Sequence, residues 1–377
     1  MVAPMCQVGP AVLGSFSMVM ATGIVAAALR QEGLTPAADV MLAVAAAGLV
    51  VLAVAAGWRA ARQPATLRAE LACPRRAFAA FTLPAACGVV GMGLATSGLP
   101  AAGEVLAAAG AAAWLAMTAL IPARMAVSRR ARPVLADVNG TWYLWAVATQ
   151  SLAIMAVVLL AAGALTAGPA AVAALATWLA GLAIYVLTTA LVVARLRRSG
   201  VGPPGARTGY WIAMGAASIS VLAAAHILSI RGVPAVAAAR SPVTAAAVAL
   251  WLLATCLTVV LAAATAAVWL RSRRRPKYDP SAWMLVFPLG MYATASQLLG
   301  ATASLHPVRL AGEILTWPAA TAWLTVLAAM AAVPLTKADG RARAAARPPS
   351  AGHFSARCRQ SAAAISWPPW RGRPSGE

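Results

Sequence analysis

Residues 37–57 read AADVMLAVAAAGLVVLAVAAG, and their only charged side chain is Asp39, near the start of the stretch. The hydrocarbon core of a bilayer is about 30 Å thick, and an α-helix rises about 1.5 Å per residue. About 20 apolar residues therefore cross that core as one helix. A stretch of this length and composition predicts a membrane-spanning helix.

The rest of the chain has a similar composition. Of the 377 residues, 62% are hydrophobic and only 10% are charged, which is too little charge to cover a soluble protein of this size. The sequence therefore predicts an all-α membrane protein with ten transmembrane helices. The apolar stretches are at 12–29, 37–57, 77–97, 102–121, 138–163, 170–194, 208–230, 242–269, 282–303 and 311–333.

Basic residues are concentrated in alternate loops. The loops after every second span, together with the C-terminal tail, hold 26 of the 30 Lys and Arg residues. The four on the other side are Arg30, Arg231, Arg240 and Arg309. By the positive-inside rule this distribution places both termini in the cytoplasm, with the spans in the plasma (inner) membrane. The same topology explains the net charge of +21, so we expect no nucleic acid as a partner.

The spans divide the chain into three segments. Residues 1–10 form a short cytoplasmic N-terminus without the basic region of a signal peptide, and residues 11–335 form the ten-helix transmembrane domain. Residues 336–377 are rich in Arg, Ala and Pro and lack an apolar helical stripe. We therefore expect this last segment to be a basic, disordered cytoplasmic tail.

Residue types that bind metals or perform catalysis are sparse. The five cysteines are scattered without a CxxC pair, and His226, His306 and His353 are far apart in the sequence. We therefore expect no disulfide framework, no metal, no cofactor and no enzymatic activity.

The spans alternate in composition. The odd-numbered spans begin near residues 12, 77, 138, 208 and 282, so the repeat is about 60 to 75 residues long and each unit is one helical hairpin. Odd-numbered spans carry small and polar residues in their middles, whereas span 2 is almost wholly Ala, Val and Leu. Polar groups facing lipid are costly, so the alternation favours five inner helices around a central path and five outer helices facing lipid. Tight helix packing is the competing explanation for the small residues.

The candidate path-lining residues come from all five odd-numbered spans. They are Ser17, Thr22, Gly23, Pro84, Gly88, Thr149, Gln150, Gly215, Ser218, Gly290 and Thr294. No Asp, Glu, Lys or Arg lies in the middle of a span, and the one titratable candidate within a span is His226, near the outer end of the seventh. An uncharged path fed by basic loops suits small anions better than cations, and hydroxyl groups along it would bind an anion weakly enough to release it.

Four segments resemble the tellurite-resistance/dicarboxylate transporter family, which includes TehA-like proteins, malate permeases, sulfite exporters and slow anion channels. Together they extend the resemblance over roughly residues 10–335. The segments are GSFSMVMATGI at 14–24, NGTWYL with ATQS at 139–144 and 148–151, YWIAMGA at 210–216, and VFPLGMY at 286–292.

The resemblance implies five hairpins in a quasi-fivefold ring, with the odd-numbered helices lining a central pore, and a homotrimer in the bilayer. It also implies that the Phe of the Phe-Pro pair in the ninth span gates the pore, which here is Phe287 with Pro288. Without the resemblance, Phe287 would be interpreted as a packing residue beside a proline kink.

Two transport functions remain open on the sequence alone. The first is movement of small anions, such as C4-dicarboxylates or other organic and inorganic anions, through a gated pore. The second is proton-coupled export of dicarboxylate or sulfite by a secondary carrier, for which the absence of a midplane carboxylate is unfavourable.

Overall fold

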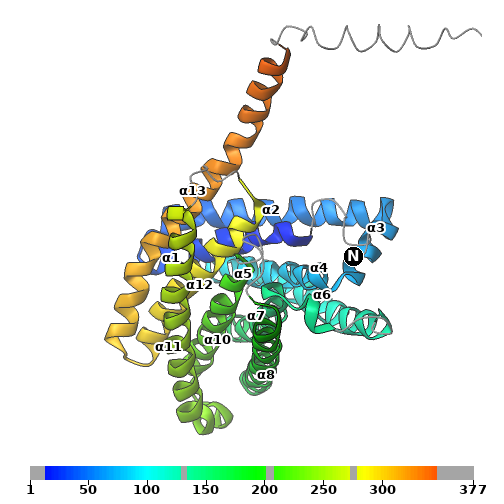
Figure 1. Ribbon diagram of the computed structural model, residues 1–377. Helices are drawn as coiled ribbons and strands as arrows, with labels where there is room; N and C mark the ends of the chain where they lie inside the picture. Colours follow the sequence, from blue (N-terminus) through cyan, green and yellow to red (C-terminus); the bar gives the residue numbers. More distant parts are fainter. Residues whose placement is uncertain (1–12, 129–133, 201–207, 272–277, 346–377) are drawn as a thin grey trace, which may run out of the picture. The chain divides into compact units, whose positions relative to one another are not determined.

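The computed structural model describes residues 13–128, 134–200, 208–271 and 278–345, and in these ranges it is helical with no strand (Figure 1). The predicted N-terminal segment and most of the predicted tail lie outside the described residues. The chain divides into two compact units, and the boundary in the sequence falls after Leu327. In the second unit, the described residues are helical as far as Ala345, so the helix continues beyond the predicted end of the membrane domain.

Five inner helices correspond to the odd-numbered spans. They are α1 (Phe16–Gln31), α5 (Thr82–Thr96), α7 (Tyr143–Ala161), α10 (Trp211–Ser229) and α12 (Trp283–Thr302). Each contacts the next in this order, and α12 contacts α1, so the contacts form a closed cycle (Figure 1). Small residues in these helices permit the close approach, and most of their side chains are buried.

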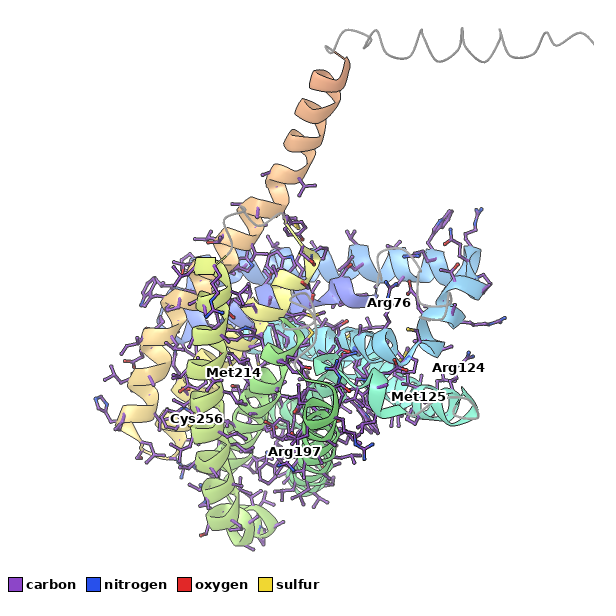
Figure 2. All side chains as sticks on the ribbon, in the orientation of Figure 1. Arg76, Arg124, Met125, Arg197, Met214 and Cys256 are labelled. Atoms are coloured by element: carbon purple, nitrogen blue, oxygen red, sulfur yellow. The ribbon has the colours of Figure 1, made fainter. Side chains whose placement is uncertain are left out.

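Five longer outer helices correspond to the even-numbered spans. They are α2 (Thr35–Arg62), α6 (Pro100–Ser128), α8 (Ala167–Ser199), α11 (Pro234–Arg271) and α13 (His306–Ala345). The first four each contact the inner helix that precedes them. Their outward faces are apolar, as at Val50 and Val54 of α2, and Cys256 of α11 is likewise exposed (Figure 2). Such faces are stable against lipid and not against water.

Each inner helix ends in the same kind of turn before its outer helix begins. One residue in each turn has a positive φ: Gly33, Gly98, Gly163, Gly232 and Ser304. Glycine adopts this conformation without the steric penalty that a Cβ brings, which explains four of the five choices. In four turns the next residue closes a Schellman motif with a backbone hydrogen bond to the carbonyl five residues earlier. These bonds are Leu34 to Leu29, Leu99 to Leu94, Ala164 to Leu159 and Leu305 to Gly300.

Each inner helix is also preceded by one turn of 3-10 helix. These turns are η2 (Leu13–Ser15), η3 (Phe78–Phe81), η6 (Gly140–Trp142), η7 (Thr208–Tyr210) and η8 (Pro280–Ala282). Asn139 and Asp279 cap two of them, since each side chain accepts a hydrogen bond from the backbone N–H two residues later. The same 3-10 start therefore recurs in all five hairpins, and the Schellman end recurs in four.

By length and composition, nine helical segments of the described residues can cross a membrane. The expected first span corresponds to α1, whose 16 residues are fewer than those of any of these nine segments. The outer helices extend beyond the predicted spans, because prolines near their starts are compatible with a first helical turn and arginines continue the helix past the apolar part.

Two short helices, α3 (Pro64–Ala72) and α4 (Pro74–Ala77), link α2 to the second inner helix, and η5 (Val134–Asp137) follows α6. Cys73, between α3 and α4, is disulfide-bonded, whereas Cys87 and Cys256 are free. The expectation of no disulfide is therefore wrong at Cys73. Spacing along the chain did not reveal this pairing, because it depends on which segments the fold brings together.

Candidate functional site

A small cavity lies where all five inner helices meet. Its volume is about 10 Å³, close to the minimum that holds a single water molecule. Its lining is apolar except for Ser151 and the backbone of Gly88. The lining residues are Ile24, Gly88, Val89, Met92, Ser151, Ile154, Ile219, Leu222 and Met291. The centre of the bundle is therefore closed to anything larger than water.

Glycines set how closely the inner helices approach one another. A Cβ added to Gly88 would lie 2.7 Å from the Cβ of Ser151, and one added to Gly23 would lie 2.7 Å from Cγ1 of Val89. Such distances are too short for real side chains, so both contacts require glycine. A Cβ added to Gly290 would lie 2.9 Å from Cγ2 of Ile24. Three predicted path-lining glycines thus occupy helix contacts, and only Gly88 also lines the small cavity.

Phe287 and Pro288 lie in the contact between α12 and α10. Both are buried, and a Cβ on Gly215 would lie 3.1 Å from Cγ of Pro288 and 3.4 Å from Cε1 of Phe287. Phe287 precedes Met291, which lines the small cavity, by one helical turn, so the two lie on the same face of α12. Pro288 has no N–H and leaves the carbonyl of Met284 without its helical partner.

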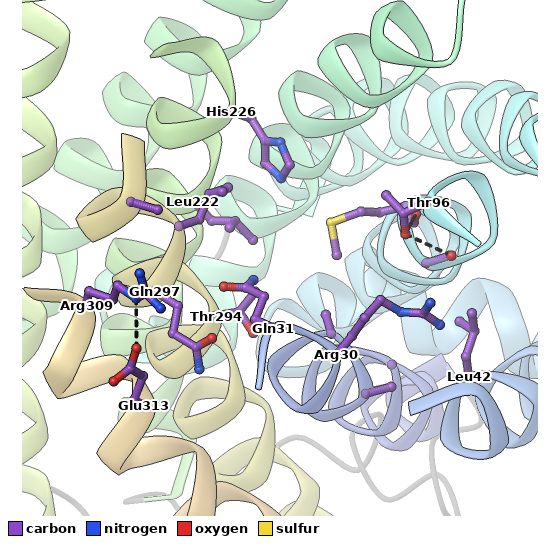
Figure 3. Close-up of a pocket in the computed structure, with 17 residues that line it drawn as sticks. Arg30, Gln31, Leu42, Thr96, Leu222, His226, Thr294, Gln297, Arg309 and Glu313 are labelled. Carbon is purple, nitrogen blue, oxygen red and sulfur yellow. Dashed lines mark hydrogen bonds and ion pairs between the residues drawn. The ribbon is translucent and has the colours of Figure 1, made fainter. Parts of the chain in front are cut away.

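A much larger cavity of about 440 Å³ lies at the C-terminal ends of four inner helices (Figure 3). Gly23 and Thr294, both predicted path-lining residues, are in its wall. Met92 and Leu222 line both this cavity and the small one. The two cavities therefore share a wall and follow one another along the inner helices.

Charged and amide side chains surround the large cavity. Arg30 pairs with Asp39 of α2, and Nε of Arg309 donates to Oε1 of Glu313 at 2.8 Å (Figure 3). Nε2 of Gln297 donates to Oε1 of Glu32 at 2.8 Å. The lining itself contains two arginines and one carboxylate, together with His226. Both arginines are paired with carboxylates, so the wall offers an anion guanidinium N–H groups and not a net positive charge.

Sequence reasoning did not assign Arg30 and Arg309 to the path. Both had been noted only as two of the four basic residues on the sparsely charged side of the topology. That scarcity was the available signal, because two of only four such residues now line one cavity.

Several predicted hydroxyl ligands are directed towards outer helices instead of the cavities. The hydroxyl of Thr149 accepts a hydrogen bond from the indole of Trp114 on α6 at 2.9 Å, and that of Thr22 accepts one from Trp323 on α13 at 3.0 Å. Gln150 donates to the carbonyl of Trp178 on α8 at 3.2 Å. The two hydroxyls and Nε2 of Gln150 are therefore occupied by helix-to-helix hydrogen bonds, whereas Oε1 of Gln150 is buried without a partner in the described part of the chain.

The tryptophan contacts form a repeating pattern. In four hairpins, an indole N–H of the outer helix donates to an oxygen on the inner helix of the next hairpin in the cycle. The pairs are Trp114 with Thr149, Trp178 with the carbonyl of Ser220, Trp251 with Ser296, and Trp323 with Thr22. Each bond satisfies a polar group that would otherwise lie in an apolar environment.

The other predicted hydroxyls donate to nearby backbone carbonyls, that of Ser17 to Gly14 and that of Ser218 to Met214. The hydroxyl of Thr294 lies 2.9 Å from the carbonyl of Gly290 and 3.3 Å from that of Ile24 on α1. Pro84 is buried in α5. Of the predicted set, the structure therefore places Gly88, Gly23 and Thr294 in the walls of the two cavities.

Comparison with known proteins identifies the family. The family model described as voltage-dependent anion channel, SLAC1, matches residues 12–331. Two relatives are uncharacterized membrane proteins of Mycobacterium tuberculosis, from strains CDC 1551 and H37Rv. Each is 36% identical over 149 residues, which are 39% of this chain and 75% of the relative. The chain is thus a multi-pass membrane protein that belongs to the SLAC1 family of voltage-dependent anion channels.

Proposed function

We propose that this protein moves small anions along the axis of its five inner helices, which act as a quasi-fivefold ring of one ten-span domain. The observation that carries the proposal is the pair of consecutive cavities. A wide cavity with two arginines in its wall adjoins a narrow apolar cavity that all five inner helices line. A basic entrance concentrates anions, and an apolar constriction without strong ligands lets them leave.

The proposed substrates are C4-dicarboxylates and other small organic or inorganic anions. At about 440 Å³ the wide cavity accommodates an ion of this size with part of its hydration shell. Gln31 in its wall offers amide N–H donors without adding charge, whereas the donors of Gln297 and Thr96 are bonded within the protein. The site needs no metal or other cofactor for this function, and transport involves no catalytic step.

The proposed orientation places the wide cavity on the outer side of the plasma membrane and both termini in the cytoplasm. It follows from the distribution of arginines between the loops, since the wide cavity lies at the ends where basic residues are few. The resemblance to the family further suggests a homotrimer.

The proposed gate is Phe287, with Pro288 beside it. Three features support this role. Phe287 is buried, and its ring packs against Gly215, which has no side chain. It also lies on the same face of α12 as Met291, which lines the small cavity. A bulky ring on that face blocks a narrow path, and the missing hydrogen bond at Pro288 makes the helix easier to bend.

Anion flux from reconstituted liposomes tests the proposal. Potassium salts of chloride, nitrate, sulfate and a C4-dicarboxylate are compared at equal ionic strength, with protein-free liposomes as the control. We expect flux that depends on the anion and is unchanged when potassium is replaced by a larger cation. Flux that follows the cation contradicts the proposal.

Proton-coupled export is the second candidate, and one observation favours it. His226, the titratable residue noted within a span, lines the wide cavity and can exchange a proton there. A pH-sensitive dye inside the same liposomes separates the two functions. Proton movement in a fixed ratio to the anion indicates a carrier, whereas current without proton movement indicates a channel.

A further inference from the structure

A third cavity, of about 260 Å³, lies apart from the proposed path. It is bounded by the C-terminal part of α2, by α3, and by parts of α5 and α6. Leu67, Leu83 and Met117 make most of its wall apolar, and Arg59, Gln63 and Glu70 are its polar members. The volume is below the 300–1,000 Å³ or so of sites for drug-sized molecules, and suits a smaller group.

Glu70 is an unusual member of this wall. Glu70 is only 5% exposed, and its Oε1 is buried with no hydrogen-bond partner among the described residues. Nη2 of Arg59 lies 3.9 Å from that oxygen, so the two side chains form an ion pair at a distance too long for a hydrogen bond. A buried carboxylate oxygen without a donor is costly, so the cavity offers a place that a hydrogen-bond donor with positive charge would fill.

The cavity can be reached from the lipid side of α2. Ala53 and Gly57 both line it and are exposed on the helix surface. The neighbouring Val54 and Trp58 are more than half exposed, so the opening lies in an apolar face. The guanidinium of Arg62 lies 4.4 Å from the centre of the Trp58 ring. Tryptophan with arginine at a helix end is typical of the level of lipid headgroups.

We infer that this cavity binds the headgroup of phosphatidylethanolamine. The primary ammonium of that lipid supplies the N–H donors that Oε1 of Glu70 lacks, and its positive charge adds to that of Arg59, the ion-pair partner of Glu70. Arg59, in the same wall, suits the phosphate, and the acyl chains can lie along the apolar face of α2. Phosphatidylcholine has the same phosphate but no N–H, and phosphatidylglycerol has no cation to offer Glu70. This inference does not rest on the anion path.

The test uses the whole purified protein in detergent, with lipids of identical acyl chains. Phosphatidylethanolamine is compared with its N-monomethyl, N-dimethyl and trimethyl forms, the last being phosphatidylcholine. Native mass spectrometry measures the bound fraction, and thermal unfolding measures the stabilisation. We expect affinity to fall at each methylation and to differ about tenfold between the ends of the series, as for a charged hydrogen bond.

Two variants assign the preference to this cavity. Glu70→Gln keeps the volume and removes the charge, and should abolish the preference, whereas Glu104→Gln, on the exposed surface of α6, should keep it. Gly57→Leu should fill the mouth without a clash, because a Cβ there meets nothing within 4 Å. Gly168→Leu, at an equally open position of α8, is its control.

The methylation series on the unmodified protein decides the outcome even if Glu70→Gln does not fold. Equal binding of all four headgroups would assign the cavity to an acyl chain alone. If none of the four lipids binds, the cavity is filled by water or by side chains of the protein itself. Either result overturns the inference, as does a Glu70→Gln protein that still prefers phosphatidylethanolamine.

Discussion

The two ends of the inner helix bundle differ, because one end is closely packed and the other surrounds a wide cavity with arginines in its wall. Towards the N-terminal ends, Phe287, Pro288 and Gly215 pack closely, and the adjacent cavity holds about 10 Å³. At the C-terminal ends, the helices surround about 440 Å³ with Arg30 and Arg309 in the wall. On the proposed function, the arginines at one end attract an anion and the apolar packing at the other end stops it. Substitutions at the two ends should therefore act differently on flux.

The largest effect is expected at the closed end. Phe287→Ala removes the ring of the proposed gate, one helical turn before Met291 of the small cavity. It should raise anion flux in liposomes about tenfold or more, since a barrier lower by about 1.4 kcal/mol is a factor of ten in rate. Phe81→Ala is the control, because Phe81 is equally buried but stacks on Trp145, which hydrogen-bonds to the outer helix α6. Unchanged flux through folded Phe287→Ala protein would remove Phe287 as the gate.

A smaller effect is expected at the open end. Arg309→Gln removes one positive charge from the wide cavity and leaves Glu313 without its partner. Anion flux should fall about threefold at 0.01 M salt and much less at 1 M, where the Debye length is about 3 Å. Arg231→Gln, an exposed arginine outside the cavity wall, should have little effect. A loss that is equal at both salt concentrations would mean that Arg309 acts by packing and not by charge.

The opposite sign is expected for the carboxylate of the same pair. Glu313→Gln leaves Arg309 unopposed and should raise anion flux about twofold at low salt. Initial rates at 0.01 M salt, with the anion supplied on either side, provide the measurement. A decrease in flux would show that Glu313 positions Arg309, and that the charge of the cavity is not what limits the rate.

The smallest effect is expected at the outward-facing hydroxyls. Trp114→Phe and Thr149→Val each remove one partner of a 2.9 Å hydrogen bond and should lower the free energy of unfolding by about 0.6–1 kcal/mol. The double variant should lose little more than either single one, because both act on the same bond. Anion selectivity should stay unchanged. A change in anion selectivity in the Thr149→Val protein would mean that the Thr149 hydroxyl does line the anion path.

The sequence predicted the hairpin organisation well because each hairpin repeats local signals. Apolar length marked the spans, the composition separated inner from outer helices, and loop charges gave a consistent alternation. The family model that matches residues 12–331 confirms the family resemblance of the segments at 14–24 and 286–292. Such signals are local, so they can be recognised before any tertiary contact is known.

The direction of individual side chains was not predictable in the same way. The inner helices are buried on most sides, so composition indicates that Thr22 and Gln150 are inside the bundle but not which neighbour they face. Their partners, Trp323 and Trp178, are distant in sequence and meet them only in the fold. Arg30 and Arg309 were interpreted as topological charges for the same reason, since their convergence on one cavity requires the helices to be assembled.

The central claim is that anions cross along the axis of the inner helices past Phe287. The reversal potential of Phe287→Ala protein in a planar bilayer, under a potassium chloride gradient, tests it most directly. We predict a reversal potential close to the equilibrium potential of chloride, with a conductance larger than that of the unmodified protein. A reversal potential close to that of potassium, or no conductance from folded protein, would contradict the claim.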